Sequence, residues 1–133
     1  MEKETVLDNP DITVWYYPDK KIVHHQFHQF ATGKNLQDGL NKGAETLEKN
    51  RANKWLSDDR KNTAIGKEDM EWTKTVWRPR VIEAGWKYWA LVLPEKTVGQ
   101  MAMKRIVQEY ADTGVTVRIF SDPEEAMKWL EAQ

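Results

Sequence analysis

Histidine is the first candidate for chemistry in this sequence, because an imidazole can act as a base or bind a metal near neutral pH. The chain has three, His24, His25 and His28, in a segment whose pattern predicts a strand. Neighbours on a strand point to opposite faces, and His24 and His28 would lie about 13 Å apart at about 3.3 Å per residue. The spacing therefore argues against a metal site and favours a solvated or hydrogen-bonded surface role. The sequence has no Gly-x-Ser-x-Gly motif that would supply a serine nucleophile beside a histidine base.

The second candidate is the run Ser57-Asp58-Asp59-Arg60, which follows a short predicted strand over residues 54–57. Open α/β sheets place ligands beyond the carboxyl ends of parallel strands, which is where this run would lie. Two carboxylates beside an arginine can bind a cation, act as acid and base, or form a solvated turn. We expect Asp58 and Asp59 to point in different directions, so a carboxylate pair that shares a proton is not predicted.

The third candidate combines tryptophan and arginine, which are enriched at interface hot spots. Trp72, Trp77, Arg78 and Arg80 lie close together on a helix predicted over about residues 67–84. At about 100° per residue, Trp72 and Trp77 face different ways. We assign Trp77 to the core and Trp72 to the partly exposed surface.

The same helix should not be straight. Pro79 lacks a backbone donor and disfavours helical geometry at Arg78, so we expect a kink near Thr75 or a break into two pieces. Gly85 then ends the helix.

The elements that position these candidates follow from hydrophobic periodicity. Residues 12–17 and 21–27 predict a hairpin around a turn at 18–20. A helix capped by Asn35 then presents Leu36, Leu40, Ala44 and Leu47 on one stripe, with Gly39 and Gly43 beside it where they would allow a close approach to a sheet.

Residues 87–93 are apolar on both alternating sets, which is typical of a strand covered on both faces. The segment from Pro94 to Gly114 predicts a helix with a stripe of Val98, Met101, Ala102, Ile106 and Tyr110. A strand at 115–120 and a helix capped by Asp122, with Pro123 at its first position, complete the chain. The order ββαβαβαβα predicts a single α/β domain over residues 1–133, with a mixed, mostly parallel five-stranded sheet flanked by helices.

Composition excludes several classes of protein. The 133 residues suit one core, and 40% hydrophobic with 31% charged residues predict a soluble globular protein. There is no apolar run of membrane-spanning length and no signal peptide, so we expect a cytoplasmic protein without integral membrane association. The absence of cysteine excludes disulfides and thiolate metal sites.

Charge and glycine spacing exclude further functions. The net charge is −1, and only residues 49–87 are mildly basic, with ten basic and six acidic side chains. Nucleic acid is therefore not an expected partner. No glycine motif for a dinucleotide or P-loop is present, and the sequence predicts no cofactor, no metal and no assembled catalytic set.

Several segments together resemble the SpoIIAA-like branch of the STAS superfamily. The resemblance extends from the first hairpin to the last helix, and the segments that carry it are 55–60 (WLSDDR), 68–72 (EDMEW), 77–80 (WRPR), 84–88 (AGWKY), 92–95 (VLPE), 99–101 (GQM) and 120–130 (FSDPEEAMKWL). The resemblance implies a sheet of mixed direction flanked by helices. It also implies a relation to anti-sigma-factor antagonists and to CRAL-TRIO lipid-binding domains, in a branch whose bacterial members mostly lack an assigned activity.

The sequence departs from the antagonists at their regulatory turn. Their switch is a phosphorylatable serine in an Asp-Ser-Ser-Gly-like turn at a helix start. Here Ser57 is followed by two aspartates and no glycine, so the phosphosite is not carried over to this chain.

Three functions follow as expectations. The first is a non-enzymatic binding or regulatory module that contacts a protein partner or an apolar ligand through Ser57, Asp58, Asp59, Arg60, Trp72, Trp77, Arg78 and Arg80. The second is a small-molecule or lipid carrier with a cavity like that of CRAL-TRIO domains. The third is a small enzyme with Asp58 or Asp59 as base and Arg60 or Arg80 as an anion clamp. Seven tryptophans in so short a chain also favour a homodimer.

Overall fold

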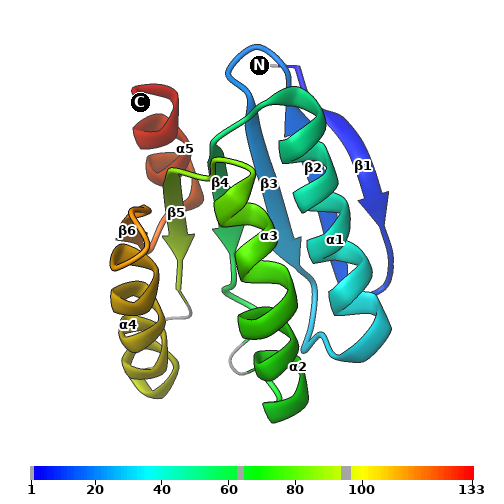
Figure 1. Ribbon diagram of the computed structural model, residues 1–133, viewed down its shortest axis with the longest axis vertical. Coiled ribbons are helices and arrows are strands. Elements are labelled where there is room, and N and C mark those ends of the chain that lie inside the picture. The colour runs from blue at the N-terminus through cyan, green and yellow to red at the C-terminus, as the bar shows by residue number, and fades with distance from the viewer. Residues whose placement is uncertain (1, 63–64, 94–96) are drawn as a thin grey trace.

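A single mixed sheet organises the computed structural model, which describes residues 2–62, 65–93 and 97–133. The six described strands lie in the order of the sequence: β1 (Glu4–Asp8), β2 (Ile12–Tyr17), β3 (Ile22–Phe27), β4 (Lys54–Asp58), β5 (Tyr88–Val92) and β6 (Thr116–Phe120) (Figure 1). β1, β2 and β3 pair antiparallel, whereas β3 to β6 pair parallel. The predicted α/β class, hairpin and parallel crossovers are confirmed.

The prediction of five strands is wrong, because it omits β1. Only Val6 and Leu7 of this strand are half-buried, and charged residues around them hide the short apolar pair. A tight turn brings β1 back along β2: the Asn9 side chain accepts hydrogen bonds from the backbone N–H groups of Asp11 at 2.9 Å and Ile12 at 3.0 Å. The strand conformation of β1 therefore depends on its pairing with β2, since its own hydrophobic pattern is too short to predict a strand.

The helices divide unequally between the two faces of the sheet. One face packs against α1 (Gly33–Asn50), α3 (Arg78–Glu83) and α4 (Thr97–Ala111), and the other packs against α5 (Pro123–Glu131). Each of the three parallel crossovers leads to the next strand in the same direction along the sheet. Because parallel crossovers share one handedness, their helices lie on the same side of the sheet (Figure 1). β5 contributes side chains to the cores on both faces of the sheet. Trp89 and Leu91 pack in one core cluster, and Ala90 and Val92 pack in the other.

Two glycines let α1 lie close to the sheet, as predicted. A Cβ atom at Gly43 would lie 2.7 Å from Cζ2 of Trp55, and one at Gly39 would lie 2.6 Å from Cγ2 of Ile12. The predicted stripe of Leu36, Leu40, Ala44 and Leu47 is buried beside them in the core of this layer.

The start of α1 differs from the prediction. The helix begins at Gly33, two residues before the predicted cap Asn35, and a carboxylate from a distant element caps it. Asp69 accepts hydrogen bonds from the hydroxyl of Thr32 at 2.7 Å and from the backbone N–H of Gly33 at 3.1 Å. A carboxylate at a helix N-terminus is favourable, and this one comes from 36 residues further along the chain, so local sequence does not reveal it.

The predicted kink is confirmed and takes the form of a π-helical turn. α2 (Lys67–Trp72) passes into η1 (Thr73–Trp77) and then α3. The N–H of Arg78 donates to the carbonyl of Thr73, five residues earlier. Pro79 has no N–H to offer, and a wide turn before it accommodates the missing donor.

The face of α4 is shifted from the predicted one. Tyr110 is buried and Ile106 is half-buried against the core, but Met101 is 71% exposed. Nine residues at about 100° each place Met101 opposite Tyr110. The predicted start at residues 94–96 and the side chains of Val98 and Ala102 lie outside the described residues. The last helix agrees with the prediction, since the side chain of Asp122 accepts from the N–H of Glu124 at 3.0 Å.

The core accommodates the tryptophans. Trp55, Trp77, Trp86 and Trp89 are buried in one aromatic cluster with neighbouring ring centroids 5.2–5.8 Å apart, and the other three are half-buried. The number of tryptophans therefore gives no reason to expect a dimer. Within the described ranges, no helix is sufficiently long and apolar to cross a membrane.

We predict that Gly43→Ala destabilises the fold by about 1–3 kcal/mol, because the new methyl group overpacks against the fixed ring of Trp55. Glycine to alanine at an exposed helix position would instead stabilise by about 1 kcal/mol. Urea unfolding measures the difference. Glu45→Ala, at an exposed position of the same helix, should stay within about 0.5 kcal/mol of the parent; a neutral or stabilising Gly43→Ala would contradict the close contact.

Candidate functional site

A small pocket lies over the carboxyl ends of the central parallel strands, between α1, the kinked helix and α4. Its volume is about 60 Å³, and most of its lining is apolar. The described lining residues are His25, Phe27, Leu36, Leu40, Ser57, Asp59, Ile65, Met70, Thr73, Trp77, Arg78, Trp89, Ile106 and Tyr110. An apolar pocket with a few convergent polar groups is the usual form of a small-molecule site.

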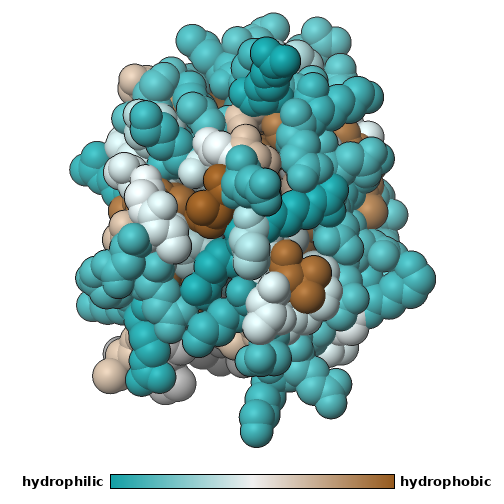
Figure 2. Space-filling model, in the orientation of Figure 1, coloured by the Kyte–Doolittle hydropathy of each residue, from teal (hydrophilic) through white to brown (hydrophobic). Residues whose placement is uncertain are grey.

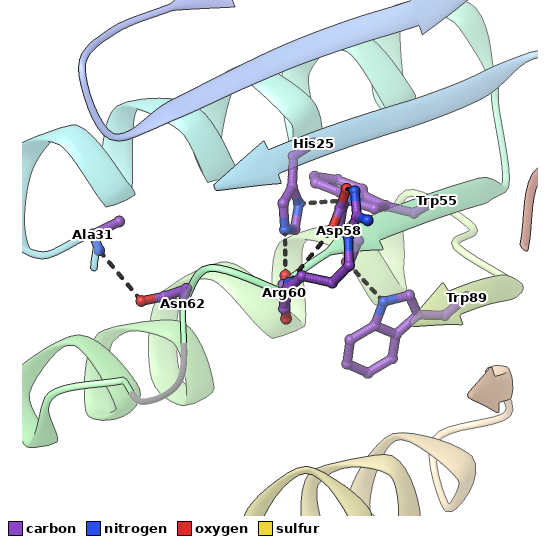
Figure 3. Close-up of polar contacts among 9 residues, drawn as sticks. His25, Ala31, Trp55, Asp58, Arg60, Asn62 and Trp89 are labelled. Carbon is purple, nitrogen blue, oxygen red and sulfur yellow. Dashed lines mark hydrogen bonds and ion pairs between the residues drawn. The ribbon is translucent and has the colours of Figure 1, made fainter. Parts of the chain in front are cut away.

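The polar floor of the pocket is built by strand register. His25 of β3 lies opposite Ser57 of β4, and the two side chains point to the same face. Asp59 follows directly after β4 and turns back toward β3. Figure 3 shows His25 pointing from its strand toward the end of β4, with Trp55 and Trp89 on either side of this junction.

The protonation of His25 follows from its neighbours. The indole N–H of Trp55 can only donate, and it donates to Nδ1 of His25 at 2.9 Å. Nδ1 therefore carries no proton, and the neutral ring has its proton on Nε2, 2.9 Å from Oδ1 of Asp59. His25 is thus a neutral donor to Asp59, with both ring nitrogens engaged. The expectation of a surface role for this histidine is wrong: it is 4% exposed, because β3 is covered by α1.

Ser57 is also fixed by an indole. Its Oγ accepts a hydrogen bond from Nε1 of Trp89 at 2.8 Å (Figure 3), and the residue is buried. The indole of Trp89 therefore orients the buried hydroxyl of Ser57.

Asp58 and Arg60 lie on the other side of the sheet. Asp58 accepts hydrogen bonds from Nε of Arg60 at 2.9 Å and from Nη2 at 2.8 Å. Burial of the Asp58 carboxyl opposes its ionisation, but the hydrogen bonds from Arg60 outweigh this and lower its pKa. Asp58 and Asp59 point in different directions, as predicted, and the structure places Asp58 and Arg60 apart from Ser57 and Asp59.

The tryptophan and arginine cluster also divides. Trp77 lines the pocket and donates its indole N–H to the carbonyl of Leu40 at 2.8 Å, and Trp72 is half-buried, as predicted for both. Arg80 lies outside the pocket and pairs with Glu48 of α1 through two hydrogen bonds of 2.8 and 3.0 Å.

Arg78 is the arginine that reaches the pocket. Its guanidinium stacks on the ring of Tyr110, with Cζ 4.4 Å from the ring centroid, and its Nη2 pairs with Glu109 at 3.0 Å. Its Nε is buried and has no hydrogen-bond partner among the described residues. Of the predicted site residues, the pocket therefore unites Ser57, Asp59, Trp77 and Arg78.

His24 occupies the opposite face and is distinct from the pocket. Its Nδ1 lies 3.1 Å from the hydroxyl of Tyr17, and its ring stacks on that of Tyr17. Burial disfavours the charged imidazolium and lowers the pKa of His24 to about 3. The described part of the chain contains no cluster of three His, Cys, Asp or Glu side chains arranged to hold a metal ion.

The principal residues that sequence reasoning missed are His25, Trp55, Trp89 and Tyr110. The pairing of His25 with Ser57 is a matter of strand register, which depends on how β3 and β4 meet. The strand alternation did carry one usable signal, since it separates His25 from His24.

No protein-family model, curated protein or solved structure matches this chain. The resemblance to the SpoIIAA-like family therefore stays a prediction from the sequence.

We predict that the neutral ring of His25 carries its proton on Nε2 and not on Nδ1. Nitrogen-15 chemical shifts of the imidazole distinguish the two neutral forms and the cation. Because the donor-only indole of Trp55 faces Nδ1, a proton found on Nδ1 would contradict the assigned hydrogen bonds. His28, whose Nε2 lies 2.6 Å from the hydroxyl of Thr13, serves as a partly accessible reference in the same spectrum.

We also predict that stability falls as the pH is lowered from 6.5 toward 3, because unfolded His24 binds a proton that the folded side chain does not. The limiting slope is about 1.4 kcal/mol per pH unit. Urea unfolding at pH 7 and pH 5 should show this loss in the parent and a smaller loss in His24→Phe. Equal losses in the parent and in His24→Phe would show that another group is responsible.

Proposed function

We propose that this chain is a non-enzymatic binding module that holds a small, largely apolar ligand in the pocket between α1, η1 and α4. The observation that carries the proposal is the pocket itself, whose aromatic and aliphatic walls enclose a floor of fixed polar groups at the carboxyl edge of the sheet. Its volume of about 60 Å³ suits an occupant of a few heavy atoms. A lipid would need a cavity several times larger, given that sites for drug-sized ligands measure about 300–1,000 Å³.

The polar floor favours binding over catalysis. A general base must present a free lone pair to the proton that it removes, but both ring nitrogens of His25 are engaged by Trp55 and Asp59. Ser57 has no histidine partner among its assigned hydrogen bonds, since its Oγ accepts from Trp89. Hydrogen bonds within the protein hold these polar groups in place in the lining of the pocket.

The surface gives weaker support to a protein partner. Figure 2 shows the helical face as mostly hydrophilic, with small and separate hydrophobic patches. The large hydrophobic side chains that the described surface exposes, Phe30, Val76, Met101 and Ile119, come from four different elements or loops. Docking surfaces for proteins are usually contiguous apolar patches.

The test uses n-propanol as a neutral probe and the tryptophan indole signals of the ¹H–¹⁵N spectrum as the readout. Trp77 and Trp89 line the pocket, whereas Trp129 lies on α5 beneath the other face. We expect propanol to shift the first two signals in a saturable way and to leave the Trp129 signal unmoved. Shifts of equal size at all three, or none at Trp77 and Trp89, would contradict the proposal.

Two matched variants locate the binding. Thr73 and Thr75 both lie on η1, and each donates its hydroxyl to the carbonyl four residues earlier at 2.8 Å, but Thr73 lines the pocket and Thr75 does not. Thr73→Leu should fill the pocket and weaken propanol binding by about tenfold or more, the equivalent of about 1.4 kcal/mol. Thr75→Leu should leave binding unchanged.

A further inference from the structure

The charges of the pocket indicate what kind of ligand it takes. Among the described residues that line it, Asp59 and Arg78 carry a formal charge and the others are apolar or neutral. We propose that the pocket selects a small organic cation, an amine whose ammonium group binds the carboxylate of Asp59. This inference rests on the proposed function and adds the class of ligand.

The charge of Asp59 is not balanced by its histidine partner. Trp55 holds Nδ1 of His25 as an acceptor, so the ring that donates to Asp59 is neutral. Protonating His25 would turn Nδ1 into a donor that faces the donor of Trp55. The hydrogen bond therefore orients the carboxylate without neutralising it. The neighbouring Arg60 does not compensate either, because it turns to Asp58 on the other side of the sheet.

Arg78 is already committed to other groups. It pairs with Glu109 and stacks on Tyr110, so its charge is balanced within α4 and the kinked helix. Its unpartnered Nε is buried. An anion in the pocket would thus meet the carboxylate of Asp59 and a guanidinium whose charge is already paired with Glu109.

The walls suit an ammonium group. Phe27, Trp77 and Trp89 contribute aromatic rings to the lining, beside Tyr110, whose ring already stacks on the guanidinium of Arg78. The negative face of an aromatic ring attracts a cation, and aromatic side chains around a carboxylate form a favourable environment for organic ammonium ions. Burial strengthens the attraction to Asp59, since the side chain of this residue is only 11% exposed.

Three probes that share one carbon chain test the charge preference: n-propylammonium, n-propanol and propionate, each titrated at neutral pH against the indole signals of Trp77 and Trp89. We expect propylammonium to bind at least about tenfold more tightly than propanol, as one charge-assisted hydrogen bond provides. We expect propionate to bind more weakly than propanol, because its carboxylate would lie beside that of Asp59.

Adjacent aspartates supply the matched variants. Asp59→Asn removes the charge in the pocket and keeps an oxygen that can accept from Nε2 of His25. Asp58→Asn removes the same charge one residue away, on the other side of the sheet, where Arg60 is the partner. Asp59→Asn should abolish the preference for propylammonium over propanol and leave propanol binding intact, whereas Asp58→Asn should keep the preference.

The outcomes separate the two proposals. Saturable propanol binding with equal or tighter propionate binding would overturn the cation inference and leave the binding module standing. A preference for propylammonium that survives in Asp59→Asn would also overturn it, because the selected charge would lie elsewhere. If none of the three probes shifts the Trp77 and Trp89 signals, both proposals fail.

Discussion

The contact between Trp55 and the backbone of α1 is the constraint on which the rest of this structure depends. Gly43 allows the indole to lie directly against the helix, and the same indole packs on Trp77 and Trp86 at ring-centroid distances of 5.3 and 5.8 Å. Its N–H also fixes His25. The side chain of Trp55 therefore sets the distance between α1 and the sheet and packs at the centre of the aromatic cluster. It also determines which nitrogen of His25 carries the proton.

The kinked helix formed by α2, η1 and α3 provides one wall of the pocket. Pro79 breaks the regular hydrogen-bond pattern, and η1 absorbs the break within one wide turn. The segment then brings Thr73, Trp77 and Arg78 to the same pocket, while Arg80, two residues further, pairs with Glu48 of α1. A π-helical turn is less stable than a regular one and often accompanies a functional site, and here it lies at the pocket.

Patterns that repeat along the chain were predictable, and contacts between distant segments were not. The hairpin, the stripe of α1, the doubly covered strand β5 and the kink at Pro79 follow from periodicity and from the chemistry of proline. β1 was missed because it depends on pairing with β2, and the capping of α1 by Asp69 joins elements far apart in sequence. At the site, Ser57 and Asp59 could be placed at the strand end, but their association with His25 required the register of β3 and β4.

The linear order of the sheet has a consequence for how the chain acquires its structure. Every strand pairs with its predecessor in the sequence, so no strand has to insert between two that are already formed. During synthesis, a chain that emerges N-terminus first can extend the sheet at one growing edge, and each crossover helix can pack as soon as the strand beneath it is in place. α5, the last element, then covers the second face over β4, β5 and β6.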